Sequence, residues 1–318
     1  MQFGLHVGTR GVGADPDNLA RIARQAESLG FAHLAIPDHI VIAAQVDSRY
    51  PYNESGSWPA VDTGTCLEQV GTLIFIAGVT EKIRLLTSVM VLPYREPILA
   101  AKLLATADVL SKGRLTVGVG VGWMAEEMTL LRSPRFAERG AASNEYIEAF
   151  RALWTEARPS YRGRHVAFER VRFDPKPTQK PHPPIWVGGE TAPARRRAGR
   201  LGDGWYPVGA NPRAWLDTPE LFAAGLAEVR GHAEAAGRDP GAIDVGLYAN
   251  WYKLGEPQPG REGGRRAFTG PAEAVLEDLA AYAAVGVRHL VIGFESTELA
   301  HALDEIERFA SEVMAKTG

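Results

Sequence analysis

The chain has 318 residues, of which 45% are hydrophobic and 23% are charged, and its formal net charge is −3. This near balance of basic and acidic residues gives no electrostatic reason to expect nucleic acid or an anionic membrane as partner. The single cysteine, Cys66, excludes an internal disulfide and a cysteine metal cluster.

Short apolar runs alternate with longer amphipathic runs along the chain. Residues 16–30 show the helical pattern, because Leu19 and Ile22 belong to an apolar set with 3–4 spacing and Asp15 or Asp17 can cap it. Strands are expected at 3–8, 31–37, 82–92, 114–121, 183–189, 203–209, 242–250 and 287–294. Helices are expected at 16–30, 66–78, 97–110, 141–154, 191–201, around 213–236, 271–286 and 297–315.

Eight strand–helix units predict the architecture. Strands separated by helices are expected to be parallel, and eight of them in about 300 residues is the count of a (β/α)8 barrel. We therefore expect a single α/β domain over residues 1–318, of the TIM-barrel class with insertions. A doubly wound open sheet is the alternative, but it seldom has eight such evenly spaced units.

Three long segments interrupt this repeat. Residues 38–65 and 251–270 follow the second and seventh strands, so in a barrel they lie at the C-terminal face and are expected to act as lids over the active site. Residues 156–182 form an insertion after the fourth-unit helix, and their alternating pattern predicts a small hairpin near the opposite face.

The N-terminus lacks a basic region followed by an apolar run, and no stretch reaches about 18 uninterrupted apolar residues. We therefore expect no signal peptide, no membrane association and a reducing, cytoplasmic location.

The segment 116–123 reads T-V-G-V-G-V-G-W. It is not a dinucleotide fingerprint, because that motif needs G-x-G-x-x-G and Trp123 occupies the position of the last glycine. On a strand, Gly118, Gly120 and Gly122 all point to one side. Either a flat ligand approaches the backbone there, or the glycines make room for bulky neighbours in the core.

Two further motifs lie where barrel enzymes carry their catalytic and binding groups. Asp38 and His39 follow the second strand directly, and His39 can act as a general acid or base with the adjacent carboxylate orienting it. The alternative is a loop histidine whose partner is a backbone carbonyl. Gly188, Gly189 and Thr191 leave the fifth strand and open a helix, which suits a phosphate or merely an ordinary capped helix.

A metal site is not expected. A metal-dependent barrel hydrolase would have a His-x-His pair at His6, but position 8 is Gly8, and no other such pair occurs. Lys253, the one lysine near a strand's C-terminal end, is expected to be a solvated loop residue rather than a Schiff-base lysine.

Together these motifs resemble the bacterial luciferase-like flavin and deazaflavin oxidoreductases, over nearly the full chain. The matching stretches are AESLGFAHLAIPDH (26–39), TSVMVLPYREPILAAKLLATADVLSKGR (87–114), GVGVGW (118–123), and PPIWVGG followed by RRRAGRLGDGW (183–205). Within that superfamily the chain looks most like the branch that uses coenzyme F420, a 5-deazaflavin.

The resemblance implies roles for individual residues. Asp38 and His39 would lie by the deazaflavin ring, with His39 as the catalytic proton donor or acceptor. Ser88 and Val89 would be joined by a non-prolyl cis peptide that forms a bulge behind the ring. The remaining cofactor contacts implied are Gly120, Gly122 and Trp123 near the ring, and Gly188, Gly189 and Thr191 at the phosphate. The expected apolar substrate pocket consists of Tyr50, Tyr52, Trp58, Trp123 and Trp251.

The chain departs from the family pattern in two places. Sugar-phosphate dehydrogenases of the F420 branch often have a glutamate after the glycine run, but here that position is Trp123, with Glu126 and Glu127 as possible stand-ins. Luciferase itself has an arginine that contacts the phosphate of FMN, and the corresponding residue looks like Val121, which counts against FMN.

We therefore expect an F420-dependent oxidoreductase that transfers a hydride between deazaflavin C5 and a small organic substrate. An FMN-dependent monooxygenase fed by a separate flavin reductase is the alternative, and a flavin-binding protein without turnover is a third. The resemblance also implies a homodimer. Neither the substrate nor the direction of hydride transfer can be read from the sequence.

Overall fold

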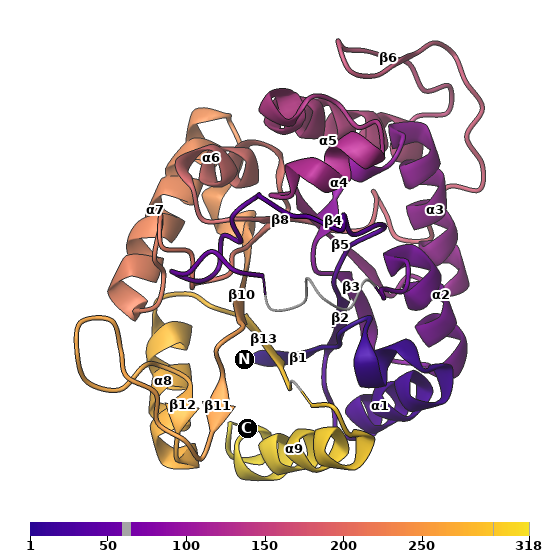
Figure 1. The fold of residues 1–318 in the computed structure, drawn as a ribbon. Helices are drawn as coiled ribbons and strands as arrows, with labels where there is room; N and C mark the ends of the chain where they lie inside the picture. The colour runs from indigo at the N-terminus through magenta and orange to yellow at the C-terminus, as the bar shows by residue number, and fades with distance from the viewer. Residues whose placement is uncertain (59–64, 295, 318) are drawn as a thin grey trace.

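The computed structural model describes residues 1–58, 65–294 and 296–317 (Figure 1). Its main strands are β1 (Gln2–His6), β2 (His33–Ile36), β3 (Arg84–Thr87), β4 (Met90–Val91), β5 (Leu115–Gly120), β8 (Ile185–Gly188), β9 (Gly204–Tyr206), β10 (Asp244–Ala249) and β13 (His289–Gly293). Among the described residues these nine strands form one sheet in the order β3-β2-β1-β13-β10-β9-β8-β5-β4, and β3 also pairs with β5. All these pairings are parallel, so the sheet is a closed barrel, and the predicted (β/α)8 fold is confirmed.

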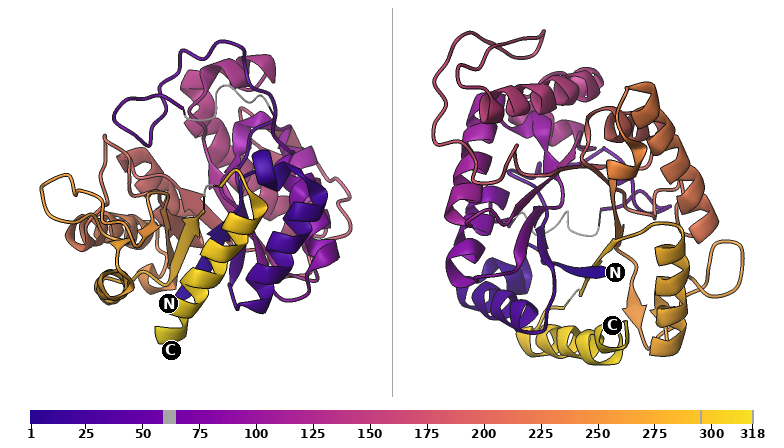
Figure 2. Two further views of the ribbon diagram at one scale, coloured as in Figure 1. Left: turned by 60° about the horizontal axis from the view of Figure 1, so that its bottom comes forward. Right: turned by 180° about the vertical axis from the view of Figure 1, so that it is seen from behind.

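The helices form an outer ring around the strands, as Figures 1 and 2 show. They are α1 (Pro16–Ser28), α2 (Gln69–Val79), α3 (Pro97–Leu110), α4 (Ala125–Leu130), α5 (Arg139–Thr155), α6 (Ala192–Leu201), α7 (Pro219–Ala235), α8 (Ala272–Ala284) and α9 (Leu299–Glu312). Short 3-10 turns occur at Gly11–Ala14, Leu92–Tyr94, Phe136–Glu138, Pro240–Ala242 and Met314–Lys316. None of the helices in the described ranges is long and apolar enough to cross a membrane.

Capping side chains decide where several helices begin. The Asp15 carboxylate accepts a hydrogen bond from the backbone N–H of Asn18, so Asp15 caps α1. Helix α2 starts at Gln69 rather than at 66, because Glu68 is its N-cap. Helix α7 likewise begins later than expected, because Thr218 caps it and a proline fills its first position.

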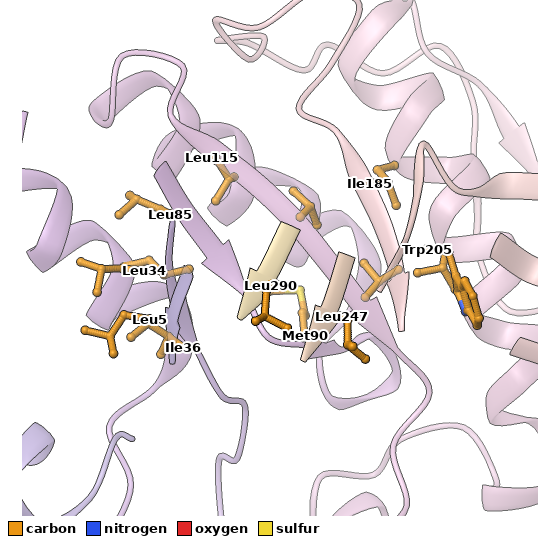
Figure 3. Packing of buried hydrophobic residues seen from close by; sticks show 14 of the residues in the cluster. Leu5, Leu34, Ile36, Leu85, Met90, Leu115, Ile185, Trp205, Leu247 and Leu290 are labelled. Carbon is orange, nitrogen blue, oxygen red and sulfur yellow. The ribbon is translucent and has the colours of Figure 1, made fainter. Parts of the chain in front are cut away.

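Alternation along the strands separates two apolar layers. Leu34 and Ile36 point outward to the helices, and Ala35, between them, points into the barrel. Figure 3 shows part of the outer layer, in which Leu5, Leu34, Ile36, Leu85, Met90, Leu115, Ile185, Trp205, Leu247 and Leu290 are labelled. The barrel interior is filled by Ala35, Leu86, Trp186, Tyr206 and Val291. The barrel is therefore a packed core and not a pore.

The expected strand 82–92 is divided in two. A cis peptide bond joins Ser88 to Val89 between β3 and β4, as the resemblance implied. The predicted hairpin in the insertion is also present, as β6 (Tyr161–Arg162) paired with β7 (Ala167–Phe168). The short helix α4 was not expected.

The two expected lid segments differ in how much of them is described. Residues 59–64 of the segment 38–65 lie outside the described residues. In the segment 251–270, β11 (Lys253–Leu254) pairs with β12 (Thr269–Gly270), which the sequence pattern did not indicate. That either segment covers an active site stays a prediction.

Candidate functional site

The C-terminal ends of the barrel strands bring the expected site residues to one end of the barrel. Strand register aligns Ile36 with Thr87, and Val119 with Val187. The loop after β2, the bulge after β3, the turn after β5 and the turn after β8 therefore emerge at the same face. This is the face where (β/α)8 enzymes carry their active sites.

His39 is hydrogen bonded to a glutamate 88 residues away. Its Nδ1 lies 2.7 Å from Oε2 of Glu127, on α4. The Glu127 side chain is fully buried, and that of His39 is 11% exposed. Burial alone would raise the pKa of Glu127, but the hydrogen bonds from His39 and from two backbone N–H groups outweigh it and lower that pKa. Glu127 is therefore an ionised partner that can orient the imidazole.

Two adjacent glutamates anchor the loop that carries His39. Oε1 of Glu127 accepts the backbone N–H groups of Ile40 and Val41 at 2.6 and 3.1 Å. Oε1 of Glu126 accepts those of Asp47 and Ser48 at 2.9 and 3.0 Å. Short charge-assisted bonds of this kind are the strong ones, so α4 fixes the loop at two points.

Asp38 does not orient His39, which corrects the expectation from the sequence. Its carboxylate makes a bidentate pair with the guanidinium of Arg95, with two distances of 2.8 Å, and accepts the N–H of Val91 at 2.8 Å. Arg95 also binds Glu68. Burial would lower the pKa of Arg95, but Asp38 and Glu68 outweigh burial and raise it. Asp38 thus ties the loop after β2 to β4 and to the segment that begins α3.

Aromatic side chains surround His39. The rings of Trp58 and Trp123 lie 4.6 and 6.3 Å from its ring, measured between centroids. Tyr50 packs edge-on against Trp123 and Tyr52, at 5.4 Å from each. Four of the five aromatic residues expected in the pocket are therefore gathered beside the catalytic candidate. That they form the apolar surface of a substrate pocket stays a prediction.

Trp251, the fifth expected residue, lies in the segment 251–270, and its place in the pocket stays a prediction. It packs on Phe268 and under the Arg266 guanidinium, and its Nε1–H donates to the carbonyl of Ala267.

The glycines of β5 face the barrel interior, as the alternation predicted. A Cβ at Gly118 would lie 2.1 Å from the carbonyl oxygen of Thr87, and one at Gly120 would lie 2.6 Å from Cγ2 of Val89. Gly122 has a φ of +79°, and a Cβ there would meet Met128. Bulky neighbours therefore account for these glycines, and a ligand is not needed to explain them.

The turn after β8 leads into the N-terminus of α6, where the sequence predicts a phosphate site. Gly189 has a φ of +102°, a conformation that L side chains rarely adopt. Thr191 is the N-cap of α6, yet its side chain makes no capping hydrogen bond. The N–H groups of a first helical turn have no intrahelical partner and can bind an anion. That these groups bind a phosphate stays a prediction.

Glu190 is a buried acid within that turn, and sequence reasoning missed it. Its two oxygens accept the N–H of Val208 at 2.6 Å and the amide of Asn211 at 2.9 Å. Burial raises the pKa of Glu190 to about 7, although these hydrogen bonds oppose the shift. Burial and the nearby Glu190 carboxylate also raise the pKa of Tyr52. The loop that carries the aromatic cluster therefore reaches the turn after β8.

A second histidine at this end of the barrel is unsuited to proton transfer. His6 stacks on Tyr248 at 4.7 Å, and burial, together with Arg10, lowers the pKa of His6 to about 4. It is neutral at pH 7 and resists protonation. Of the two, only His39 has a partner that stabilises an imidazolium.

The partner of His39 could have been suspected from one signal in the sequence. Glu126 and Glu127 are adjacent acids just after the glycine run, and that run ends a strand at the face where barrel enzymes carry their active sites. Which of the two meets His39 depends on the turn of α4, which local patterns did not predict. In the described residues no cluster of His, Cys, Asp and Glu is suited to hold a metal ion.

Relatives of this chain among known proteins include an F420-dependent enzyme and an FMNH(2)-dependent enzyme. Protein Rv0953c of Mycobacterium tuberculosis is 37% identical over 206 residues, which cover 64% of this chain and 71% of that protein. The F420-dependent glucose-6-phosphate dehydrogenase of Segniliparus rotundus is 30% identical over 236 residues, covering 72% of this chain and 63% of that enzyme. The FMNH(2)-dependent dimethylsulfone monooxygenase of Pseudomonas putida is 34% identical over 176 residues, covering 55% and 46%.

Solved structures share the fold along the whole chain. Monooxygenase RslO1 from Streptomyces bottropensis has a TM-score of 0.76 and 23% identity, with full coverage of both chains. An F420-dependent secondary alcohol dehydrogenase, solved with an F420-acetone adduct, has a TM-score of 0.75 and 18% identity, covering 99% of this chain and 98% of that chain. The sequence profile for luciferase-like monooxygenases matches residues 1–253. The chain therefore belongs to the luciferase-like monooxygenase family, whose members are oxidoreductases or monooxygenases.

Proposed function

We propose that this chain is a coenzyme F420-dependent oxidoreductase that transfers a hydride between deazaflavin C5 and a small organic substrate. The observation that carries the proposal is the His39 imidazole, which is hydrogen bonded to buried Glu127 and packed against Trp58 at the C-terminal face of the barrel. This is a proton-transfer group beside an apolar surface, as a hydride-transfer enzyme requires.

The residues at this face fit a ring with a phosphate-bearing tail. Val89 lies between Gly120 and Gly188, since a Cβ on either glycine would contact it, and it presents an apolar surface at the bulge. Thr191 and the first turn of α6 supply donors for a phosphate. The nearby Glu190 carboxylate would repel an anion, but both of its oxygens are engaged by Val208 and Asn211, and its raised pKa reduces its charge near pH 7.

Bound F420 would supply the hydride donor or acceptor, and the chain would supply the proton transfer. Because the ionised Glu127 accepts at Nδ1, that nitrogen of His39 carries a hydrogen and Nε2 carries the lone pair. In the oxidation of an alcohol, Nε2 takes the hydroxyl proton as the substrate carbon gives up its hydride. In the reverse reaction, protonated His39 returns that proton to the carbonyl oxygen.

The aromatic cluster indicates a substrate with an apolar body. Trp58, Trp123 and Tyr50 pack around the His39 ring and its loop, so a hydroxyl or carbonyl group would reach His39 while the rest of the molecule contacts rings. The residue after the glycine run is Trp123 rather than an acid, which disfavours a sugar phosphate.

An FMN-dependent monooxygenase with a separate flavin reductase is the second candidate, and one observation favours it. Arg139 donates to the carbonyl of Gly122, and Arg197 donates to Asn144 and Gly140. Burial lowers the pKa of both arginines, and each lacks an acidic partner among the described residues. Two unpaired guanidinium groups near the β5 turn suit the dianionic terminal phosphate of FMN.

The deciding experiment is a titration of the purified protein with oxidised F420 and, separately, with FMN, followed by cofactor fluorescence. We expect micromolar or tighter binding of F420 and FMN binding at least tenfold weaker. The reverse order overturns the F420 proposal, and oxygen consumption with reduced FMN would then be measured.

We also propose that the chain forms a homodimer. Helix α2 has no charged residue, and its Phe75 side chain is 39% exposed. The neighbouring α3 exposes Leu99 and Leu110, each at 55%. Such an apolar face on adjacent helices supports association with a second copy. Light scattering during size-exclusion chromatography is expected to give twice the chain mass for the native protein and the chain mass for Phe75→Glu.

A further inference from the structure

We propose that Glu127 is the positioning residue of the site: it fixes which nitrogen of His39 carries the hydrogen and thereby keeps Nε2 as the atom that exchanges a proton with the substrate. This inference rests on the proposed function, in which His39 performs that exchange. Glu126, its neighbour on α4, anchors the same loop without touching His39 and has no part in this assignment.

The geometry makes the contact specific. Oε2 of Glu127 faces Nδ1 of His39, and Oε1 faces the N–H groups of the two residues that follow His39. The carboxylate is thus held by the same short segment that it orients, and it cannot rotate without breaking three hydrogen bonds. Nε2 of His39 has no hydrogen-bond partner among the described residues. The nitrogen left for a substrate is therefore the one that points away from Glu127.

The surrounding charges leave this pair intact. In the described part of the chain, the ionisable groups around it include Arg10, Asp38, Cys66, Glu68, Tyr94, Arg95 and Glu126. Arg95 is paired with Asp38 and Glu68, so it does not compete for Glu127. Burial, followed by the charge of Glu127, raises the pKa of both the Tyr94 hydroxyl and the Cys66 thiol, so both stay neutral at pH 7. Arg10 lies over the Trp58 ring, 4.5 Å from its centroid.

Electrostatics gives the carboxylate two effects on His39. As acceptor at Nδ1, it selects the tautomer with the free lone pair on Nε2. As a buried negative charge, it stabilises the imidazolium formed when Nε2 takes a proton. A glutamine at this position keeps the shape but reverses the first effect. Its amide oxygen can still accept from Ile40 and Val41, and its NH₂ group then faces Nδ1, which must become the acceptor.

The test compares Glu127→Gln with Glu126→Gln, a matched control on the adjacent residue. Nitrogen-15 NMR of histidine-labelled protein, without cofactor, reads which ring nitrogen of His39 carries the hydrogen. We expect Nδ1–H in the native protein and in Glu126→Gln, and Nε2–H in Glu127→Gln. Glu127→Asp keeps the charge and is expected to retain the native tautomer, which separates orientation from folding.

Turnover then tests the consequence. We expect Glu127→Gln to lower kcat about 100-fold or more with KM changed less than threefold, and Glu126→Gln to remain within a few fold of the native enzyme. A native tautomer in Glu127→Gln overturns the assignment, and so does an altered tautomer with native kcat. If the tautomer responds as expected but the native protein turns over with neither F420 nor FMN, the proposed function fails while the Glu127–His39 link stands.

Discussion

Replacing Asp38 by asparagine separates two accounts of this residue. If Asp38 contacted the cofactor ring, the change would act on turnover. In the structure its carboxylate accepts two hydrogen bonds from Arg95 and one from the N–H of Val91, and its side chain is fully buried. We therefore expect Asp38→Asn to act first on the free energy of unfolding.

The size of the effect follows from what remains around Arg95. Removing one partner of a buried ion pair costs about 3–5 kcal/mol, because the other charge is left uncompensated. Glu68 still binds Arg95 at 2.6 Å, but the Glu68 side chain is 43% exposed, so it compensates only in part. We therefore expect Asp38→Asn to lower the free energy of unfolding by about 3 kcal/mol, at the lower end of that range. The matched change Glu68→Gln removes the more exposed partner and also weakens the N-cap of α2, so it is expected to cost about 1–2 kcal/mol, still less than Asp38→Asn.

Urea unfolding at pH 7, followed by tryptophan fluorescence, measures both losses. The double variant Asp38→Asn with Arg95→Met removes the stranded charge and is expected to recover at least about 1 kcal/mol relative to Asp38→Asn. An Asp38→Asn protein that loses less than about 1 kcal/mol of stability but loses its turnover would refute this reasoning and restore the cofactor-contact account.

Three further predictions follow from the same geometry. His39→Ala is expected to keep the affinity for the cofactor, measured by fluorescence titration, while turnover falls about 100-fold or more; unchanged turnover removes His39 from the mechanism. Gly120→Ala is expected to lower the free energy of unfolding by about 1–3 kcal/mol, because its Cβ would lie 2.6 Å from Val89. Adding Val89→Ala in the same chain should relieve most of this loss. Additive losses in the double-mutant cycle would contradict the contact. Burial, with His289 and Arg84, lowers the pKa of His33 from 6.5 to about 3, so between pH 6.5 and 3 only the unfolded chain takes the proton and the free energy of unfolding falls as the pH falls. His33→Asn should reduce this dependence of the free energy of unfolding on pH by up to about 1.4 kcal/mol per pH unit. Urea unfolding at several pH values measures it, and an identical dependence in the variant would argue against a neutral His33.

The barrel itself was readable from local patterns. Alternating period-2 and period-3.6 runs predicted eight strand–helix units, and side chains such as Asp15 confirm where helices begin. The V-G-V-G-V-G alternation predicted one face of glycines, and the structure places Val117 and Val119 in the outer apolar layer, as that requires. His39 was also placed correctly, because it follows a strand directly and parallel strands end at one face.

The partners of these residues were decided only by the tertiary structure. Asp38 meets Arg95, 57 residues away, and the adjacent His39 meets Glu127, 88 residues away. Likewise, Val89, in the bulge between β3 and β4, leaves no room for a side chain at Gly120. Short-range patterns determine which way each side chain faces. Contacts between distant segments depend on strand register and on where loops close, and those follow from the packing of the whole barrel.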